Sequence, residues 1–441
     1  MPVHSSVRGF HLLLSSLLVL SLFLAGCAVN PATGRKELAL FQVSTDQEVA
    51  IGEKTFPRAL QQMGGGYPDP RLDAYVNEVG RRLGRLSQRP DLPYTFRVVN
   101  DSIPNAFALP GGFIAISRGL LVHLENEAHL AAVLGHEVGH VAARHSVQGM
   151  QRGTLLNAAL AVLSGVTAEK GYGPLAEQAG ELTASLLENS YSRDQERESD
   201  MLGIDYMVRS GYDPSGAVQL QEFFYRKIEG GAEPSWLAGL FRTHPFSLER
   251  MLANQDYMRT NFPQALKDPR HELRPEPFLA ATAGLRKVQP AYELYEQARR
   301  LEAKNDLAAA IETYLQALEA APDEALIHAG LGLASIKAGD LNPARRYLNK
   351  AVQLDGNYYQ SHLGLGYVHL QKDDAAAAVR SLERSMELLP TLQGGFLLAE
   401  GNEKLGRSQK ALELYRAVAE ADPRGKLGRA AAERIREMEK R

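Results

Sequence analysis

The stretch that decides the fold spans residues 126–145 and reads NEAHLAAVLGHEVGHVAARH. Its apolar residues recur at spacings of three and four: Leu130, Val133, Leu134, Val138 and Val141. This periodicity places them on one face of an α-helix. Asn126 is a residue type that caps helix N-termini, so we expect the helix to begin directly after it.

His136 and His140 give this helix the motif His-Glu-x-x-His. Residues four apart lie one turn above each other, with roughly 5 to 6 Å between their Cβ atoms. Neutral imidazole nitrogens suit Zn²⁺, and the neighbouring Glu137 can reach a water molecule beside the ion without coordinating it. A half-buried helix would not leave two histidines without partners, which argues against a chance motif on a solvated helix. We therefore predict one zinc ion per chain, bound by His136 and His140, with Glu137 as the catalytic base.

A catalytic zinc ion needs a third protein ligand and an open fourth position. The best source is residues 192–200, which read SRDQERESD. Glu196 and Asp200 would share one helical face there, so Glu196 could bind the metal while Asp200 accepts a hydrogen bond from a ligand histidine. Spacing alone leaves Glu198 as a competing ligand, because periodicity does not say which carboxylate turns inward.

The surrounding sequence predicts an α+β, mainly helical domain over residues 44–262. An amphipathic helix follows a cap at Ser44 or Thr45, and a second helix spans residues 69–86. Residues 155–166 form an apolar run of about a dozen residues, short of the ~20 that a bilayer crossing needs. We interpret this run as a core helix, with a lid or membrane-contacting segment as the alternative.

A small antiparallel sheet is expected between the second helix and the motif. Residues 94–100 are rich in aromatic and β-branched side chains, and residues 106–117 contain a Pro-Gly-Gly turn between two apolar arms. A strand edge in this region could hold an extended substrate by main-chain pairing. The residues predicted to do so are Asn105, Ala106, Phe107 and Ala108.

The N-terminus has the layout of a secretory signal peptide, residues 1–26, followed by a tether, residues 27–43. An apolar run ends in Leu-Ala-Gly before Cys27, which is the single cysteine of the chain and so has no intrachain disulfide partner. This ending resembles the lipobox of bacterial lipoproteins, which predicts lipidation of Cys27. Ala28, rather than aspartate, favours the outer over the inner membrane. An ordinary signal peptide or a short membrane helix is the alternative.

Composition excludes nucleic acid as the expected partner. The 49 basic and 52 acidic residues give a net charge of -3 and are spread along the chain without a polybasic block. A hydrophobic fraction of 44% is enough for sizeable cores.

The C-terminal part repeats with a period of 34 residues. Prolines punctuate a linker at residues 263–290, and beyond it steps of 34 lead from Ala310 to Ala344 and Ala378. The period is that of the tetratricopeptide repeat, a helix-turn-helix unit. Residues 291–441 should therefore stack into an α-solenoid whose concave face binds proteins. Five tyrosines could line that face, although core packing is the favoured interpretation: Tyr292, Tyr295, Tyr347, Tyr359 and Tyr367.

These motifs together resemble the HtpX-like zinc peptidases, a family that includes the CaaX prenyl-protein peptidases, and within it the BepA-like periplasmic proteins with C-terminal repeats. The resemblance covers nearly the whole mature chain and rests on four stretches: 105–112, 136–145, 192–200 and 243–245. It implies a zincin-like fold and assigns Glu196, rather than Glu198, to zinc. Ser199 is a mild departure, because the family usually has alanine there. The resemblance also places His244 near the metal, where it either closes the fourth coordination position or stabilises the oxyanion.

The sequence thus predicts a zinc-dependent endopeptidase of the bacterial envelope that acts on unfolded or misassembled outer-membrane proteins. We expect it in the periplasm, anchored to the outer membrane by lipid. The alternative is a chaperone or assembly factor that uses its repeats to bind envelope proteins and keeps a latent or regulatory zinc site.

Overall fold

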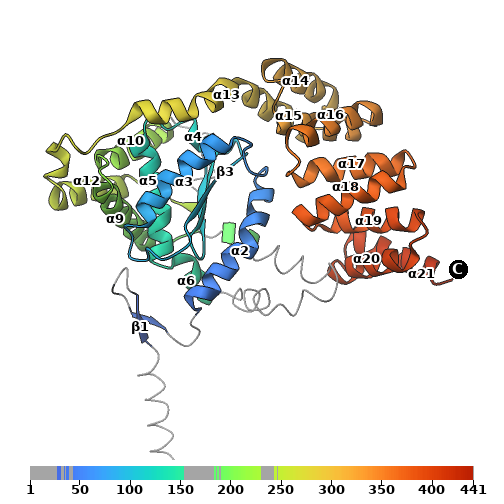
Figure 1. The fold of residues 1–441 in the computed structure, drawn as a ribbon, viewed down its shortest axis with the longest axis horizontal. Coiled ribbons are helices and arrows are strands. Elements are labelled where there is room, and N and C mark those ends of the chain that lie inside the picture. The colour runs from blue at the N-terminus through green and yellow to red at the C-terminus, as the bar shows by residue number, and fades with distance from the viewer. Residues whose placement is uncertain are drawn as a thin grey trace, which may run out of the picture.

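The structure is a computed structural model that describes residues 27–30, 34, 36–38, 43–152, 183–184, 186–187, 190–229, 243–245 and 247–440. A globular N-terminal half, blue to yellow-green in Figure 1, is followed by a stack of helix pairs coloured brown to red. This confirms the predicted class, a mainly helical domain with a small sheet followed by a repeat solenoid.

The N-terminal half surrounds a three-stranded sheet with helices. Its described elements before the motif helix are α2 (Thr45–Gln62), α3 (Pro70–Gly84), β3 (Thr95–Val99), β4 (Ala106–Leu109), β5 (Phe113–Ser117) and α4 (Arg118–Leu121). The motif helix and those after it are α5 (Glu127–Ala142), α6 (His145–Arg152), α9 (Arg193–Arg209), α10 (Ser215–Glu229), α12 (Leu248–Asn261) and the short η2 (Ala265–Lys267). In the described parts of the chain, no helix combines the length and apolar character needed to cross a membrane. The apolar run at 155–166 lies outside the described residues.

Helices α5 and α2 begin directly after the predicted capping residues, Asn126 and Ser44. The side-chain oxygen of Asn126 accepts a hydrogen bond from the backbone N–H of His129 at 2.8 Å. At α2, the side chains of Ser44 and Gln47 each bond the other's backbone N–H, which makes a capping box. These local bonds supply partners for donors that the first turn of a helix cannot satisfy itself.

The sheet has the order β3-β5-β4 and is mixed, which corrects the fully antiparallel expectation. β4 and β5 form the predicted hairpin, with Phe107 opposite Ala115. β3 instead pairs parallel with β5, with Phe96 opposite Ile114. The chain leaves β3 and enters β4 with a reversed direction, and the hairpin turn reverses it again. After these two reversals β5 runs in the direction of β3. Because β5 lies between β3 and β4, it pairs parallel with β3 and antiparallel with β4.

Helices α5 and α9 pack with their backbones unusually close. A Cβ atom on Gly139 would lie 2.9 Å from the carbonyl oxygen of Ser199, and one on Gly203 would lie 2.9 Å from the backbone nitrogen of His136. Only glycine fits at such distances. This approach brings the metal-motif face of α5 next to the carboxylates of α9.

The predicted tether contains structure in its described part. Strands β1 (Cys27–Val29) and β2 (Lys36–Leu38) pair antiparallel. Asn30 is buried, and its Nδ2 donates to the carbonyl oxygen of Ala143 at 2.9 Å. This carbonyl belongs to the C-cap of α5, where the helix itself offers no donor. The segment after Cys27 therefore contacts the end of the motif helix. The predicted signal peptide, residues 1–26, lies outside the described residues.

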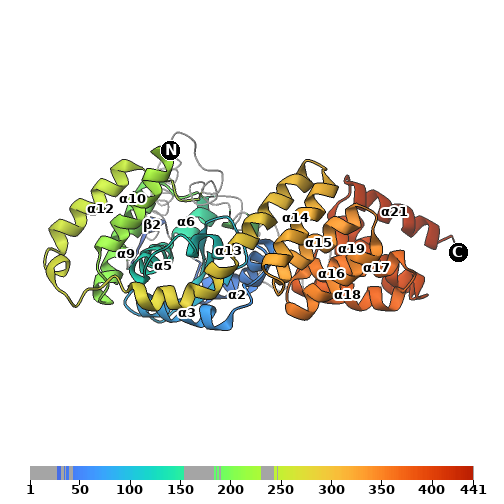
Figure 2. The ribbon, with the colours of Figure 1, turned by 90° about the horizontal axis from the view of Figure 1, so that it is seen from above.

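One long helix, α13 (Pro275–Ala303), joins the two halves across most of the predicted linker. In Figure 2 it runs from the N-terminal half into the solenoid. The helix contains two of the prolines that suggested a linker. Pro275 stands in the first turn, where its missing N–H costs nothing, and Pro290 lies inside the helix. Phe278 packs in the core of the N-terminal half, and Tyr292 packs in the core of the solenoid. The same helix thus belongs to both cores.

The solenoid follows the predicted 34-residue period. Its helices are α14 (Leu307–Ala320), α15 (Ala325–Lys337), α16 (Leu341–Leu354), α17 (Tyr359–Gln371), α18 (Ala375–Leu388), α19 (Leu392–Lys404), α20 (Ser408–Ala421) and α21 (Lys426–Met438). The repeated alanines Ala310, Ala344 and Ala378 are all fully buried. Gly332 is needed for close packing, since a Cβ atom there would lie 2.6 Å from Leu348 Cγ.

The solenoid docks on the N-terminal half through polar contacts. Gln61 on α2 donates from Nε2 to the carbonyl oxygen of Asn357 at 2.6 Å, and its Oε1 accepts from the backbone N–H of Tyr359 at 2.9 Å. The buried guanidinium of Arg118 lies 3.3 Å from the ring centroid of Tyr292. These contacts hold the concave face of the repeats toward the N-terminal half.

Candidate metal centre

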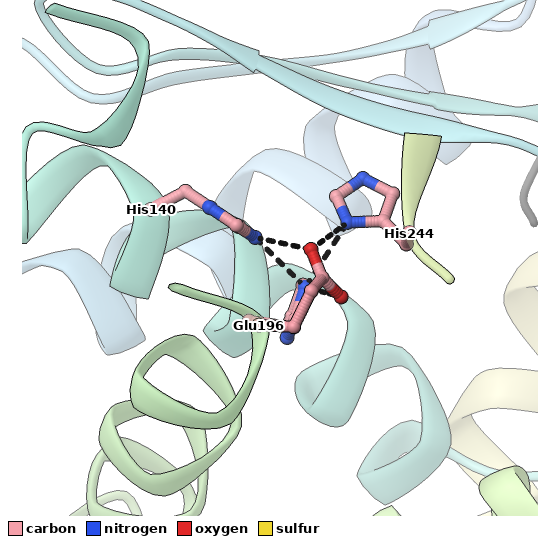
Figure 3. A group of neighbouring side chains, drawn as sticks. His140, Glu196 and His244 are labelled. Carbon is pink, nitrogen blue, oxygen red and sulfur yellow. Dashed lines mark hydrogen bonds and ion pairs between the residues drawn. The ribbon is translucent and has the colours of Figure 1, made fainter. Parts of the chain in front are cut away.

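The predicted metal residues come together although they lie in three separate segments. His136 and His140 project from α5, Glu196 from α9 and His244 from the segment before α12. Figure 3 shows His140, Glu196 and His244 pointing toward one another. One nitrogen or oxygen atom from each of the four lies within 4.8 Å of the others.

Glu196 lies at the centre of this cluster. Its Oε1 is 3.0 Å from His244 Nδ1 and 3.3 Å from His140 Nε2, and the side chain is almost fully buried. Burial alone would raise the pKa of Glu196, but the charges of His244 and Arg250 outweigh it and hold this pKa well below its usual range. The carboxylate is therefore ionised, as a metal ligand must be.

Glu198, the competing carboxylate, turns away from the cluster. Its Oε2 lies 3.0 Å from His145 Nε2, and His145 Nδ1 lies 2.9 Å from His140 Nδ1. When His140 Nε2 faces the cluster, its Nδ1–H can donate to His145, whose Nε2–H then donates to Glu198. The ring of Tyr191 also stacks on His140, with 3.8 Å between centroids. These neighbours fix the orientation of His140.

Glu137 is buried beside the cluster with unused hydrogen-bonding capacity. Its Oε1 lies 3.4 Å from His244 Nε2, and its Oε2 has no hydrogen-bond partner among the described residues. Burial raises the pKa of this carboxyl, although the nearby His244 and His136 oppose the shift. A carboxylate with a raised pKa and a free acceptor oxygen is suited to take a proton from a water molecule.

Asp200 orients His136 and is itself held by residues that the sequence analysis missed. Its Oδ1 lies 2.8 Å from His136 Nδ1, which leaves His136 Nε2 facing the cluster. Arg250 donates to both Asp200 and Glu196, and Asn254 donates to Asp200 Oδ2 at 2.8 Å. Burial of Asp200 would raise its pKa, but the charge of Arg250 dominates and lowers it. The available signal was an Arg and an Asn four residues apart on the helix after His244, but nothing local pairs them with α9.

The donor set fits a catalytic zinc ion. Two imidazoles on one helix and a carboxylate from a second are a known ligand set of catalytic zinc sites, whereas structural sites favour four protein ligands rich in cysteine. Hydrogen bonds that the Nδ1–H groups of His136 and His140 donate to Asp200 and His145 are the expected support for imidazoles that bind metal through Nε2. His136, His140 and Glu196 would hold the ion, and Glu137 would remain free beside it.

Comparison with known proteins agrees with this geometry. Residues 70–257 match peptidase family M48. The chain carries a peptidase family M48 domain. Residues 293–324 and 325–358 match the tetratricopeptide repeat, so both predicted parts of the family resemblance are confirmed.

Relatives of this chain include several proteins that are named as proteases. It is 28% identical over 265 residues to beta-barrel assembly-enhancing protease of Yersinia pestis, which covers 54% of this chain and 51% of the relative. A Vibrio cholerae protein that carries this name provisionally is 30% identical over 225 residues, 49% of this chain and 45% of the relative. Metalloprotease YcaL of Escherichia coli is 29% identical over 182 residues, 40% of this chain and 68% of the relative. The match thus spans about half the length of the first two relatives.

Replacing Glu198 with glutamine should weaken zinc binding without abolishing it. The variant removes the charged acceptor at the end of the path His140, His145, Glu198, and loss of such supporting partners typically lowers metal affinity about 10- to 100-fold. Zinc affinity is measured by competition with a chromophoric chelator. Glu222→Gln, at a partly exposed position on α10 where Glu222 pairs only with Arg226 in the described part of the chain, is the matched control and should bind zinc like the wild type. Glu196→Gln should lose more affinity than Glu198→Gln, and the reverse order would make Glu198 the ligand.

The metal-free protein should lose stability between about pH 6.5 and 8. Burial alone would lower the pKa of His244, but Glu196 and Glu137 outweigh it and raise this pKa to about 8. Because the folded-state pKa exceeds the unfolded value of roughly 6.5, this stabilisation is complete below pH 6.5 and is lost as the pH rises through 8, about 2 kcal/mol in all.

The test of this pH effect is urea unfolding of the chelated protein from pH 6 to 9. His140 and His145 have lowered pKa values through burial, so their titration acts below pH 6.5 and leaves this window clear. In His244→Asn, the free energy of unfolding should no longer fall between about pH 6.5 and 8. A slope that persists in the variant would assign the effect to another group.

Proposed function

We propose that the chain is a zinc-dependent endopeptidase. The observation that carries this proposal is the convergence of His136, His140 and Glu196 next to Glu137, whose Oε2 is buried and has no partner among the described residues. The M48 domain and the names of the relatives, one of which is called a metalloprotease, support it.

In the proposed reaction the chain's own groups orient the metal ligands and move one proton. A bound zinc ion would polarise the scissile carbonyl and lower the pKa of a water molecule. Glu137 accepts the proton of the attacking water and later delivers it to the leaving amine. Asp200 and His145 keep the rings of His136 and His140 in the tautomer that presents Nε2.

The edge strand β4 is the proposed docking site for an extended substrate. Asn105 accepts from the backbone N–H of Ser117, so the alternate residues Ala106 and Ala108 direct their backbone groups away from β5. Ala106 also lines a cavity with His136 and Glu137. A substrate strand that pairs along Asn105, Ala106, Phe107 and Ala108 would therefore pass the metal cluster.

His244 is proposed to control access to the cluster. Its Nδ1 lies 3.0 Å from Glu196 Oε1 and 3.2 Å from His136 Nε2. In this arrangement His244 would therefore be a fourth ligand of the metal. In this orientation it would close the fourth position, and the substrate carbonyl could enter only after the ring turns. If His244 instead stabilises the oxyanion, His244→Ala slows cleavage, whereas removal of a closing group speeds it.

The repeats are proposed to bind segments of client proteins. A groove of about 720 Å³ lies between the concave face and the loops at residues 62–64 and 100–102. Tyr295, Tyr359 and Tyr367 line it, and Tyr295 is at the same time buried with Tyr292 in the solenoid core. This groove also favours the second candidate function, a chaperone or assembly factor. The two functions separate if Glu137→Gln keeps client binding while losing cleavage.

We place the protein in the bacterial periplasm, anchored to the outer membrane through lipid on Cys27, where it acts on unfolded or misassembled outer-membrane proteins. The Leu-Ala-Gly-Cys ending before residue 28 supports the anchor. The name of two of the relatives, beta-barrel assembly-enhancing protease, supports the client class.

The experiment that tests the proposed function measures zinc content and casein cleavage on the same preparation. We expect about one zinc ion per chain, loss of cleavage on chelation and recovery on adding zinc. Zinc binding without cleavage under any of these conditions would favour the chaperone candidate.

A further inference from the structure

The turn between α5 and α6 contains a residue in the left-handed conformation. The metal helix α5 ends at Ala142, and α6 begins at His145. Between them Arg144 has a φ of 60°, in a region that residues with a Cβ atom adopt only at a cost in free energy. Glycine is the usual residue at such a place after a helix, because it lacks the Cβ atom that causes the strain. An arginine here must therefore be held by other parts of the chain.

The side chain of Arg144 is anchored to the segment around the start of α2. Its Nη2 lies 2.8 Å from Glu48 Oε1 and also donates to the carbonyl oxygen of Val43. Glu48 is buried, and its Oε2 accepts from Arg89 Nη1 at 2.7 Å. The same Arg89 nitrogen donates to the carbonyl oxygen of Val141 at 3.3 Å. Residues before α2 and after α3 thus fix the end of α5 together with Arg144.

The carbonyl oxygen of Ala143, directly before Arg144, accepts from two side chains. Asn30 Nδ2 donates to it at 2.9 Å and Gln148 Nε2 at 3.1 Å. The last carbonyl groups of a helix have no donor within the helix, so such side chains hold its end in place. Asn30 is buried and comes from the N-terminal segment, and Gln148 accepts from Gln195 on α9 at 3.0 Å. Two separate segments therefore fix the backbone of the turn.

The left-handed turn decides where His145 lies. In an uninterrupted α-helix, five residues correspond to a rotation of roughly 140° about the axis, so His145 would point away from His140. The turn instead brings the buried His145 back against the metal helix, with its Nδ1 2.9 Å from His140 Nδ1. The orientation of the His140 ring thus depends on the conformation of Arg144.

We propose that Arg144 and Asn30 are positioning residues of the metal centre, because they hold the turn that places His145 against His140. They act through His145, whose contact orients the ring of His140 toward the cluster. The inference rests on the proposed function, since it takes His140 as a ligand of the ion.

The experiment measures the zinc affinity of full-chain variants by competition with a chromophoric chelator. Arg144→Ala removes the anchors and keeps the strain, so it should bind zinc about 10- to 100-fold more weakly than the wild type. Arg144→Gly also removes the anchors, but glycine adopts a φ of 60° without strain, so it should recover part of the loss. Asn30→Ala should lose less affinity than Arg144→Ala, because Gln148 still donates to Ala143.

The control is Asp373→Ala. Asp373 has a φ of 57° and lies between α17 and α18 in the solenoid, so this variant introduces the same backbone strain away from the metal centre. It should bind zinc like the wild type. An equal loss of affinity in Asp373→Ala and Arg144→Ala would assign the effect to general destabilisation and overturn the proposal.

A second readout needs no metal and separates this inference from the proposed function. The 2.9 Å between the Nδ1 atoms of His140 and His145 implies that one of them donates a proton to the other. In metal-free protein with ¹⁵N-labelled histidine, this proton should give an exchange-protected signal that His145→Gln removes. The signal should persist in Arg144→Gly and Asp373→Ala and weaken in Arg144→Ala.

The outcomes decide as follows. If no form binds zinc, the proposed function fails and the proton signal alone decides on the turn. Wild-type affinity and signal in Arg144→Ala, or equal losses in Arg144→Ala and Arg144→Gly, would overturn the proposal. If Arg144→Ala does not fold, Asn30→Ala decides, because wild-type affinity and signal in that variant would contradict its positioning role.

Discussion

Glu137→Gln should bind zinc like the wild type and cleave casein about 10²- to 10⁴-fold more slowly. Glutamine keeps the size and hydrogen-bonding shape of the side chain but cannot accept the proton of the attacking water. Because Glu137 is adjacent to the ligands and not among the three proposed ones, His136, His140 and Glu196 keep their arrangement. The measurements are zinc content by elemental analysis and the initial rate of casein cleavage.

The control for this variant is Glu222→Gln, which makes the same chemical change at a partly exposed position on α10. It should leave both zinc content and rate unchanged. Wild-type turnover by Glu137→Gln would assign the base to another group and would contradict the proposed mechanism. Loss of zinc in this variant would make Glu137 a ligand instead.

Arg250→Met should destabilise the metal-free protein by about 3 to 5 kcal/mol. The guanidinium is buried and donates to both Glu196 and Asp200, and the attraction of these carboxylates raises the pKa of Arg250 despite its burial. Methionine fills a similar volume without the charge, so two buried carboxylates lose their main cation. Thermal unfolding of the chelated protein should show a melting temperature lower by roughly 6 to 20 °C.

The matched control is Arg197→Met on α9. Arg197 pairs with Glu249 at 3.2 Å, but its side chain is 42% exposed, and exposed ion pairs contribute only about 0 to 1 kcal/mol. Zinc should reduce the loss in Arg250→Met, because the ion would neutralise Glu196 while Asp200 remains uncompensated. Equal melting temperatures for the two variants would refute the view that Arg250 holds the carboxylates of the centre.

Features governed by short-range spacing could be predicted from the sequence. A four-residue separation places His136 and His140 on one helical face in any α-helix, and Asn126 can cap that helix with its own side chain. The solenoid belongs to the same class, since a 34-residue period repeats the same local packing, as the buried Ala310 and Ala344 show.

The sheet shows where such reasoning fails. Alternation and a turn signature predicted the hairpin of β4 and β5, but they carry no information on the direction in which β3 joins it. That direction depends on how residues 100–105 cross the end of the sheet. The helix α13 was not predicted for a related reason, because prolines can stand in the first turn of a helix as well as in a loop, as Pro275 does.

By itself, the sequence determined the motif helix, its cap, the repeat period and the residue types that can bind zinc. Spacing left Glu196 and Glu198 open, and the family resemblance favoured Glu196. Only the tertiary structure decided that Glu198 bonds His145 and that Arg250 and Asn254 support Asp200. The physical reason is that helical periodicity fixes which residues share a face. Which buried charge is stable there depends on the partners that other segments of the chain bring to it.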